Sequence, residues 1–277
     1  MTLKNKLFYS KKISNLLKKR VWLKFEYQNL TGSHKDREAR KLVELALKKK
    51  IKKIGCASTG NLAISLSFYA KILGLKCYVW LNNNDNQTLS LVKHLGANVK
   101  VKKTSLKNLY NLSDKFFKKN KIFNANPGSS KKKLTANKEI TSEILRENKS
   151  IECIVTCVNN GSHFLGMKSN FKKIDFIGVF SKSKLAKSIN PYSQVEIKMR
   201  LIRDNLKLIE AKDHDILRGY RLLAKEKIFA EGSACAVVGI LKKIKKYKKI
   251  CCVISGSAHL NLPEVQKIIF QNNNKLF

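Results

Sequence analysis

Residues 29–37 contain a lysine in a setting suited to covalent chemistry. Lys35 follows a Gly-Ser turn and opens a stretch with the spacing of an amphipathic helix. An amine attacks a carbonyl only after it loses its proton, and the pKa of a lysine falls readily when a pocket desolvates it. Lysines are abundant here, however, and most lysines are solvated surface residues. Lys35 therefore indicates a nucleophile only if a binding pocket accompanies it.

A second polar segment follows the next apolar run. Residues 52–57 predict a short buried strand, residues 58–61 read Ser-Thr-Gly-Asn, and residues 62–74 predict a helix that ends in glycine. At such a junction, backbone N–H groups and short hydroxyls converge, and the helix dipole favours an anion. The alternative is that the Ser-Thr-Gly-Asn turn only caps the helix.

The elements that must position these segments alternate along the chain. Strands are predicted at residues 54–57, 76–81, 98–101, 122–124, 153–158, 176–180, 207–210 and 250–255. Helices are predicted at residues 36–50, 62–73, 86–95, 106–119, 131–147, 162–171, 213–226 and 233–247. This alternation predicts an α/β fold with parallel sheets covered on both faces, in which ligands bind beyond the carboxyl ends of the strands.

Five segments, taken in order, resemble the motifs of one enzyme superfamily. Residues 29–38 match Asn-Pro-Thr-Gly-Ser-Phe-Lys-Asp-Arg-Gly except at Leu30, His34 and Glu38, and residues 57–61 match Ala-Ser-Thr-Gly-Asn without change. Residues 158–166 resemble a glycine-rich phosphate loop. Residues 230–236 resemble Val-Glu-Pro-Ala-Ser-Ala-Ala, and residues 253–260 resemble Leu-Thr-Gly-His-Gly-Leu. The chain thus resembles the tryptophan-synthase-beta superfamily of fold type II pyridoxal-phosphate enzymes, and within it most resembles the threonine synthases.

This resemblance implies two doubly wound α/β domains. The large, cofactor-binding domain is expected from residues 1–47 and 127–277, and a small mobile domain from residues 48–126. The chain is shorter than typical threonine synthases, and residues 181–205 resemble a contracted form of a longer connecting region.

The resemblance also implies roles toward the cofactor, pyridoxal 5'-phosphate. Lys35 would bond to its aldehyde as a Schiff base and move protons at the substrate carbons, and Asn61 would hydrogen-bond the ring hydroxyl. Ser255 would hydrogen-bond the ring nitrogen and leave it largely unprotonated. The phosphate would be wrapped by backbone N–H groups of five consecutive residues: Asn159, Asn160, Gly161, Ser162 and His163.

Other residues are implied to bind the substrate. Ser58, Thr59 and the backbone N–H of Leu62 would hold its carboxylate. Lys133 lies nearest to the position of a family arginine that binds a substrate phosphate, and His259 is expected at most at the rim of the pocket. Ser33 and Asp36 are expected to shape the turn and the helix start.

The implied activity is the conversion of O-phospho-L-homoserine and water to L-threonine and phosphate. A threonine or serine dehydratase and a cysteine synthase remain alternatives, although those enzymes more often have Ser-Gly-Asn-His or Ser-Gly-Asn-Thr at the turn. A degenerate, non-catalytic basic relative is a further alternative, since Asn159 and Ser162 replace glycines and Glu38 replaces another.

The amino-acid composition indicates which kinds of partner to expect. Of the 57 basic residues only eight are arginine, so we attribute the net charge of +38 to biased codon usage and expect no specific nucleic acid partner. The 277 residues contain no apolar run that could span a membrane and do not start with a signal peptide, which predicts a cytoplasmic protein. The seven cysteines show no metal-ligand spacing and are expected to be buried thiols. A small-molecule substrate and a monomer or homodimer are expected.

Overall fold

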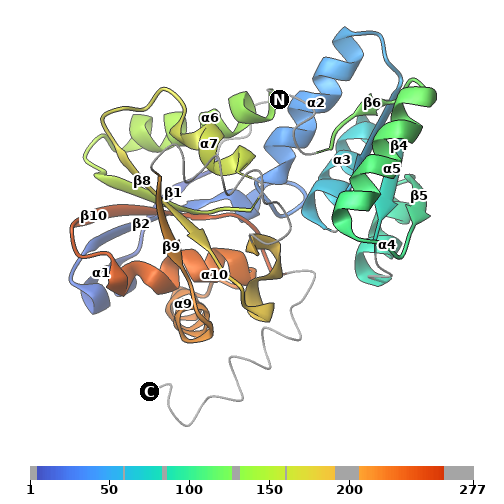
Figure 1. Cartoon of the computed structure of the whole chain (residues 1–277). Helices are drawn as coiled ribbons and strands as arrows, with labels where there is room; N and C mark the ends of the chain where they lie inside the picture. The colour runs from blue at the N-terminus through green and yellow to red at the C-terminus, as the bar shows by residue number, and fades with distance from the viewer. Residues whose placement is uncertain are drawn as a thin grey trace. The chain divides into compact units, whose positions relative to one another are not determined.

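The computed structural model describes residues 5–58, 60–82, 86–126, 132–159, 161–190 and 206–258. Contacts divide the chain into two compact units (Figure 1). Residues 1–28 and 137–277 form one, here called the six-stranded unit, and residues 29–136 form the other, the four-stranded unit. Each unit is an α/β structure built on its own sheet, which confirms the predicted fold class.

The sheet of the six-stranded unit has the order β1-β2-β10-β7-β8-β9. Its strands are β1 (Leu7–Tyr9), β2 (Arg20–Phe25), β7 (Cys153–Cys157), β8 (Asp175–Phe180), β9 (Lys207–Glu210) and β10 (Lys249–Ile254). Only the β1–β2 pairing among these is antiparallel. Parallel neighbours bring the carboxyl ends of β7 and β10 to the same edge of the sheet.

Helices cover both faces of this sheet. They are α1 (Lys11–Leu17), α6 (Lys132–Glu147, which starts within the other unit), α7 (Ser162–Lys168), α9 (Asp213–Lys225) and α10 (Gly232–Gly239), with 3-10 turns η1 (Glu26–Gln28), η2 (Lys184–Ile189) and η4 (Ile240–Lys243). Figure 1 shows α6 and α7 on one face and α9 and α10 on the other. The alternation of β10 explains this arrangement, because Cys252 packs into the core beneath α9 and α10 while Cys251 and Val253 pack beneath α6 and α7.

The four-stranded unit has the fully parallel order β5-β4-β3-β6. Its strands are β3 (Lys53–Ala57), β4 (Lys76–Leu81), β5 (Asn98–Val101) and β6 (Phe123–Asn124), and its helices are α2 (Lys35–Lys48), α3 (Asn61–Ile72), α4 (Asn86–His94) and α5 (Leu106–Lys119). Phe117 of α5 packs against Ala57 and Trp80 on one face of the sheet. Cys77 points to the opposite face, toward Ser67 of α3.

The sequence prediction failed at the N-terminus, where it placed the first strand at residue 54. The structure has β1, α1 and β2 before that point. Lys24 interrupts the apolar pattern of β2. It is fully buried, and its Nζ lies 2.7 Å from Oε2 of Glu143. A lysine in a strand normally faces solvent, but this one is buried because it forms an ion pair with a residue distant in the sequence.

One predicted helix is much shorter in the structure. The predicted helix at 233–247 is α10, which ends at Gly239 and continues only as the short turn η4. A Cβ atom at Gly239 would lie 1.8 Å from the carbonyl oxygen of Asp215, so the chain requires glycine there. The contact-based units also divide the chain at residues 28/29 and 136/137, outside the 48–126 limits predicted for the small domain, and that domain assignment remains a prediction.

Candidate active site

A rigid turn places Lys35 at the first position of α2. The N–H of Gly32, which has a positive φ of 83°, donates to the carbonyl of Asn29 at 2.8 Å. The carboxylate of Asp36 accepts hydrogen bonds from the backbone N–H of Thr31, at 2.8 Å, and from the Thr31 hydroxyl. Asp36 thus fixes the turn and the helix start, in the role that the sequence suggested for it.

The amine of Lys35 is paired with a buried carboxylate. Its Nζ lies 2.9 Å from Oε1 of Glu38, one turn further along α2. The Lys35 side chain is 15% exposed, whereas that of Glu38 is 1% exposed. Glu38 stands where the family motif has glycine, so this ion pair is a feature of this chain's own sequence.

Lys133, near the start of α6, is also buried, with 1% of its surface exposed. Its Nζ donates to the carbonyls of Ala125, at 2.7 Å, and Asn126, at 2.8 Å. Desolvation by burial lowers the pKa of Lys133 to about 8. The charge of Glu38 raises this pKa, and the charge of Lys35 lowers it. The predicted role as a ligand of the substrate phosphate would require this amine to leave both carbonyls.

The Ser-Thr-Gly-Asn turn joins β3 to α3 at the carboxyl end of the parallel sheet. The N–H of Ser58 continues the ladder to the carbonyl of Trp80 at 3.0 Å, and α3 begins at Asn61. The N-cap residue of α3 is Gly60, which has no side chain to cap the helix. Capping by a side chain at that position is therefore ruled out, and Ser58 and Asn61 lie half-buried beside the first turn. Thr59 is outside the described residues.

The predicted phosphate loop joins β7 to α7 in the six-stranded unit. Gly161 adopts the left-handed conformation with a φ of 75°, and α7 begins at Ser162. The ring of His163 is buried, where it hydrogen-bonds Thr156 Oγ1 at 2.8 Å and Asn137 Oδ1 at 2.9 Å. His163 can thus offer a ligand its backbone but not its ring. Asn159 is exposed, and Asn160 is outside the described residues.

Ser255 follows β10 and is fully buried. Its hydroxyl donates to Oε1 of Glu231 at 3.0 Å, and the hydroxyl of Ser233 donates to the same oxygen at 2.5 Å. A Cβ atom at Gly256 would lie 2.6 Å from the carboxyl carbon of Glu231, so glycine leaves space for this carboxylate. Because its hydrogen is directed at Glu231, Ser255 can meet a ring nitrogen in this rotamer only through its lone pairs. Glu231 was not predicted as a site residue, although it lies in the motif at residues 230–236.

These groups are chemically suited to pyridoxal phosphate within each unit. The four-stranded unit supplies an amine at Lys35 and an amide at Asn61. The six-stranded unit supplies a loop with a left-handed glycine at Gly161 and a buried hydroxyl at Ser255. An aldehyde, a ring hydroxyl, a phosphate and a ring nitrogen call for these four kinds of partner. His259 lies outside the described residues.

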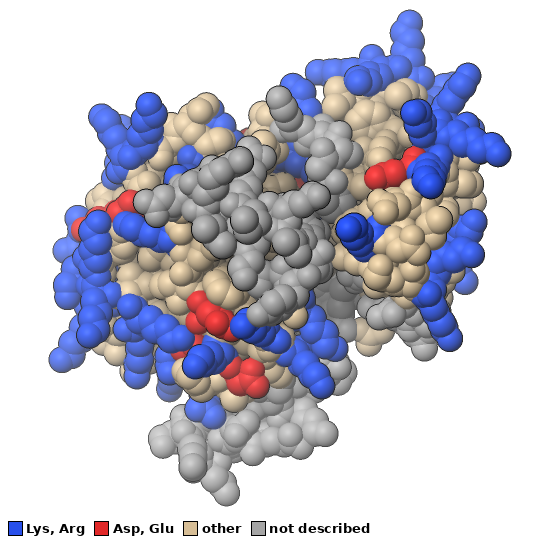
Figure 2. Space-filling model, viewed as in Figure 1, with Lys and Arg blue, Asp and Glu red and all other residues tan. Residues whose placement is uncertain are grey.

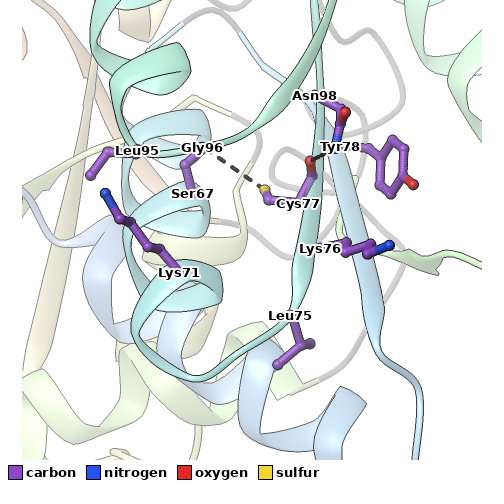
Figure 3. A pocket seen from close by; sticks show the side chains of 9 residues that line it. All are labelled: Ser67, Lys71, Leu75, Lys76, Cys77, Tyr78, Leu95, Gly96 and Asn98. Carbon is purple, nitrogen blue, oxygen red and sulfur yellow. Dashed lines mark hydrogen bonds between the residues drawn. The ribbon is translucent and has the colours of Figure 1, made fainter.

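A separate hollow of about 450 Å³ lies in the four-stranded unit, lined by residues of α3, β4 and the turn before β5 (Figure 3). Lys76, one of its lining residues, begins β4, so the hollow is at the amino end of the sheet, away from Ser58 and Asn61. Burial raises the pKa of the Cys77 thiol in this hollow to about 12, which makes it a poor nucleophile.

The described ranges contain neither a metal-binding cluster nor a membrane-spanning helix. No group of three or more His, Cys, Asp or Glu side chains there could hold a metal ion. None of the helices in those ranges has the combination of length and apolar character that crossing a membrane requires. Lys and Arg side chains are spread over the visible surface of both units and do not form one patch (Figure 2).

The parallel sheets and the lysine and glycine motifs at their edges define an α/β enzyme of fold type II. A family model described as pyridoxal-phosphate dependent enzyme matches residues 3–256, and the chain belongs to this family. Pyridoxal 5'-phosphate is accordingly its cofactor.

Curated relatives agree with this assignment, and a solved structure shares the fold. The chain is 26% identical to the threonine synthase of Methanocaldococcus jannaschii, over 86% of this chain and 70% of that protein. It is also 26% identical to the threonine synthase of Halalkalibacterium halodurans, over 86% of this chain and 77% of that protein. The structure of maize serine racemase superposes with a TM-score of 0.84 at 16% identity, covering 98% and 92% of the two chains, and shows the shared fold.

Proposed function

We propose that this pyridoxal-phosphate enzyme is a threonine synthase, which converts O-phospho-L-homoserine and water to L-threonine and phosphate. The observation that carries the proposal is the Ser-Thr-Gly-Asn turn between β3 and α3, which matches the threonine synthase motif without change. The two threonine synthases with 26% identity over 86% of the chain support it.

Bound pyridoxal phosphate supplies an aldehyde that bonds to an amine and a ring that withdraws electrons from the substrate carbons. Lys35 would provide that amine and would carry protons to and from the substrate carbons. Asn61 would hold the ring hydroxyl through its amide. Both side chains sit at helix starts, where the turns just described fix their backbone position.

The six-stranded unit contains the residues that we propose for the cofactor phosphate and the ring nitrogen. Backbone N–H groups of residues 159–163 would bind its phosphate, and the positive φ of Gly161 turns that loop into α7. Ser255 would bind the ring nitrogen, and because an unprotonated nitrogen only accepts hydrogen bonds, the hydroxyl would have to turn its hydrogen from Glu231 to that nitrogen.

The substrate would be held by the four-stranded unit. Ser58, Thr59 and the N–H of Leu62 would bind its carboxylate beside the first turn of α3. The burial of Lys133 makes it a poor ligand for the substrate phosphate, so we leave that role out of the proposed function.

The test is an assay of the full-length protein loaded with pyridoxal phosphate. We expect release of inorganic phosphate and formation of threonine from O-phospho-L-homoserine, and neither product from the Lys35→Ala variant. Serine, threonine and O-acetylserine plus sulfide are supplied in parallel reactions. No phosphate release, together with pyruvate, 2-oxobutyrate or cysteine from those substrates, would assign another reaction of the family. No turnover of any substrate and no visible absorbance with the cofactor would favour a non-catalytic relative.

A further inference from the structure

A second hollow, of about 490 Å³, lies in the six-stranded unit and is here called the basic hollow. Arg20, which begins β2, and Lys248, which precedes β10, are among its lining residues. Since β2 and β10 are parallel neighbours, the basic hollow lies at their amino ends, whereas Ser255 follows the carboxyl end of β10. The six residues of β10 put about 20 Å between these ends, so the basic hollow is separate from Ser255.

The basic hollow is lined by four cationic side chains, which are Lys18, Lys19, Arg20 and Lys248. None of the ion pairs formed within the described ranges includes any of these four groups. By contrast, Lys24 in the same unit lies 2.7 Å from Glu143. The basic hollow thus gathers cations that the protein itself does not pair with carboxylates.

One carboxylate, that of Glu152, acts on these cations from outside the lining of the hollow. It accepts hydrogen bonds from the backbone N–H groups of Lys248, at 2.8 Å, and Lys249, at 3.2 Å. Burial lowers the pKa of Lys19, the charge of Lys248 lowers it further, and Glu152 raises it by less. Four positive groups and one negative group leave a net of three positive charges at the basic hollow.

Hydrogen bonds fix the backbone that carries these cations. The N–H of Arg20 donates to the carbonyl of Lys248 at 2.8 Å, and Nζ of Lys19 donates to the carbonyl of Tyr247 at 3.0 Å. Lys18 is the C-cap residue of α1, with a positive φ of 51°, and its side chain is exposed. Cations held together in this way repel one another, and a bound anion would remove that repulsion.

Ser14 of α1 adds a neutral hydrogen-bond donor to the lining. The residue is only 4% exposed, and its Oγ accepts a hydrogen bond from the N–H of Val21 at 2.9 Å. Among the residues that the structure describes, the hydroxyl hydrogen of Ser14 has no acceptor. A serine hydroxyl can accept and donate at the same time, so this hydrogen remains available for an oxygen atom of a ligand.

We propose that the basic hollow binds a small anion that contains two or more linked phosphate groups. A single phosphate group carries about 1.5 to 2 negative charges at pH 7, which is fewer than the three uncompensated positive charges. A second linked phosphate adds negative charge and further oxygen acceptors, which arginine, lysine and hydroxyl groups can bind. The volume of the hollow is in the range of small-molecule sites. This site does not depend on the reaction proposed for Lys35.

The first test is a calorimetric titration of the full-length protein at about physiological ionic strength. The protein is saturated with pyridoxal phosphate, so that the cofactor does not leave a phosphate loop open to the added anion. Inorganic pyrophosphate is expected to bind saturably and at least about tenfold more tightly than inorganic monophosphate. Lys18→Gln/Lys248→Gln is expected to weaken the binding of pyrophosphate at least about tenfold, because two of the four cations are removed.

The matched control is Lys118→Gln/Lys119→Gln, which lowers the net charge by the same amount. These two exposed lysines lie at the end of α5, as Lys18 lies at the end of α1. The control should change the affinity for pyrophosphate by no more than about twofold, because salt screens distant surface charges. Equal weakening by the two double variants, no saturable binding, or no preference for pyrophosphate over monophosphate would overturn the proposal. Thermal unfolding checks that both variants fold, which the exposure of the substituted residues favours.

The second test locates the ligand on the wild-type chain. An acylating reagent modifies exposed amines, and mass spectrometry of the peptides gives the rate of modification at each lysine. Pyrophosphate well above its Kd is expected to slow the modification of Lys18 and Lys248 at least about fivefold and to leave Lys118 and Lys119 unchanged. Equal slowing at all four lysines would overturn the proposal, since the general positive charge of the chain would give that result.

A parallel titration with adenosine diphosphate distinguishes two sources of linked phosphates. Tyr9 is also in the lining, and 45% of its surface is exposed. Tighter binding of adenosine diphosphate than of pyrophosphate would support the site and assign it to a nucleotide, with the Tyr9 ring as a partner for the base. Equal or weaker binding of adenosine diphosphate would support the site as one for a free oligophosphate.

Discussion

Two glutamates, the buried Glu38 of the four-stranded unit and the half-buried Glu231 of the six-stranded unit, lie in the candidate site segments and are compensated differently. Glu38 in the four-stranded unit is paired with an ammonium group, Lys35. Glu231 in the six-stranded unit accepts hydrogen bonds from the hydroxyls of Ser233 and Ser255. An ion pair responds when one partner changes its charge, whereas a hydroxyl keeps the same charge throughout. We infer that the first carboxylate takes part in a change of charge and that the second holds a fixed geometry.

The largest expected effect separates Lys35 from the other lysines. Lys35→Ala should abolish the visible absorbance that the wild type develops with pyridoxal phosphate, because no other amine is assigned to the aldehyde. The matched control is Lys48→Ala, at the exposed end of the same helix. Absorbance spectra before and after dialysis measure the effect. If the absorbance band persists in Lys35→Ala but disappears in another lysine variant, that other lysine would be the one that bonds to the aldehyde.

The buried amine of Lys133 should give the stability of the protein a distinct pH dependence. Burial lowers the pKa of Lys133 from 10.5 in the unfolded chain to about 8 in the folded protein, so between these values the unfolded chain binds more protons. The contribution of Lys133 to the unfolding free energy therefore rises with pH across this window, by about 3 kcal/mol.

Urea unfolding at several pH values, with the wild type compared to Lys133→Met, isolates this contribution. The raised thiol pKa values of the buried cysteines, such as Cys153 at about 12, lower stability at alkaline pH, but equally in both proteins. The difference in unfolding free energy between wild type and variant should move in favour of the wild type as the pH rises from 8 to 10. A constant difference would contradict the lowered pKa.

A glycine substitution tests the geometry around Glu231. Gly256→Ala would place a Cβ atom 2.6 Å from the Glu231 carboxyl carbon and should destabilise the protein by about 1–3 kcal/mol. Gly60→Ala is the control, since no atom lies within 4 Å of a Cβ there. Thermal unfolding of both variants gives the comparison, and equal melting temperatures would mean that the carboxylate has room to shift.

The smallest effect is expected from Ser255→Ala. One of the hydroxyls that donate to Glu231 is lost, and stability should fall by about 1 kcal/mol. Cofactor capture, measured as the visible absorbance that develops with pyridoxal phosphate, should weaken as well, because the proposed partner of the ring nitrogen is removed. Ser233→Ala, which removes the other hydroxyl, should lower stability without the same loss of capture. Similar capture in both variants would argue against the role of Ser255.

Much of the fold followed from periodicity. The strands β4, β5 and β9 and the helix α5 have the predicted boundaries. Each is bounded by polar residues or turns, so its local pattern is unambiguous. The N-terminal β2 was missed because Lys24, a residue type that signals exposure, is buried against Glu143. Such a pair joins residues far apart in the chain, and no local window contains both.

The sequence by itself determined the family, the cofactor and the order of the motifs, because Lys35, the turn at 58–61 and the loop at 158–163 each depend on a few adjacent residues. Only the tertiary structure decided that Lys133 is buried with its amine on two carbonyls and that Glu231 receives the hydrogen of Ser255. The burial of a charge and the direction of a hydrogen bond depend on which distant segments pack together. A single short motif does not contain those segments, so it cannot predict either feature.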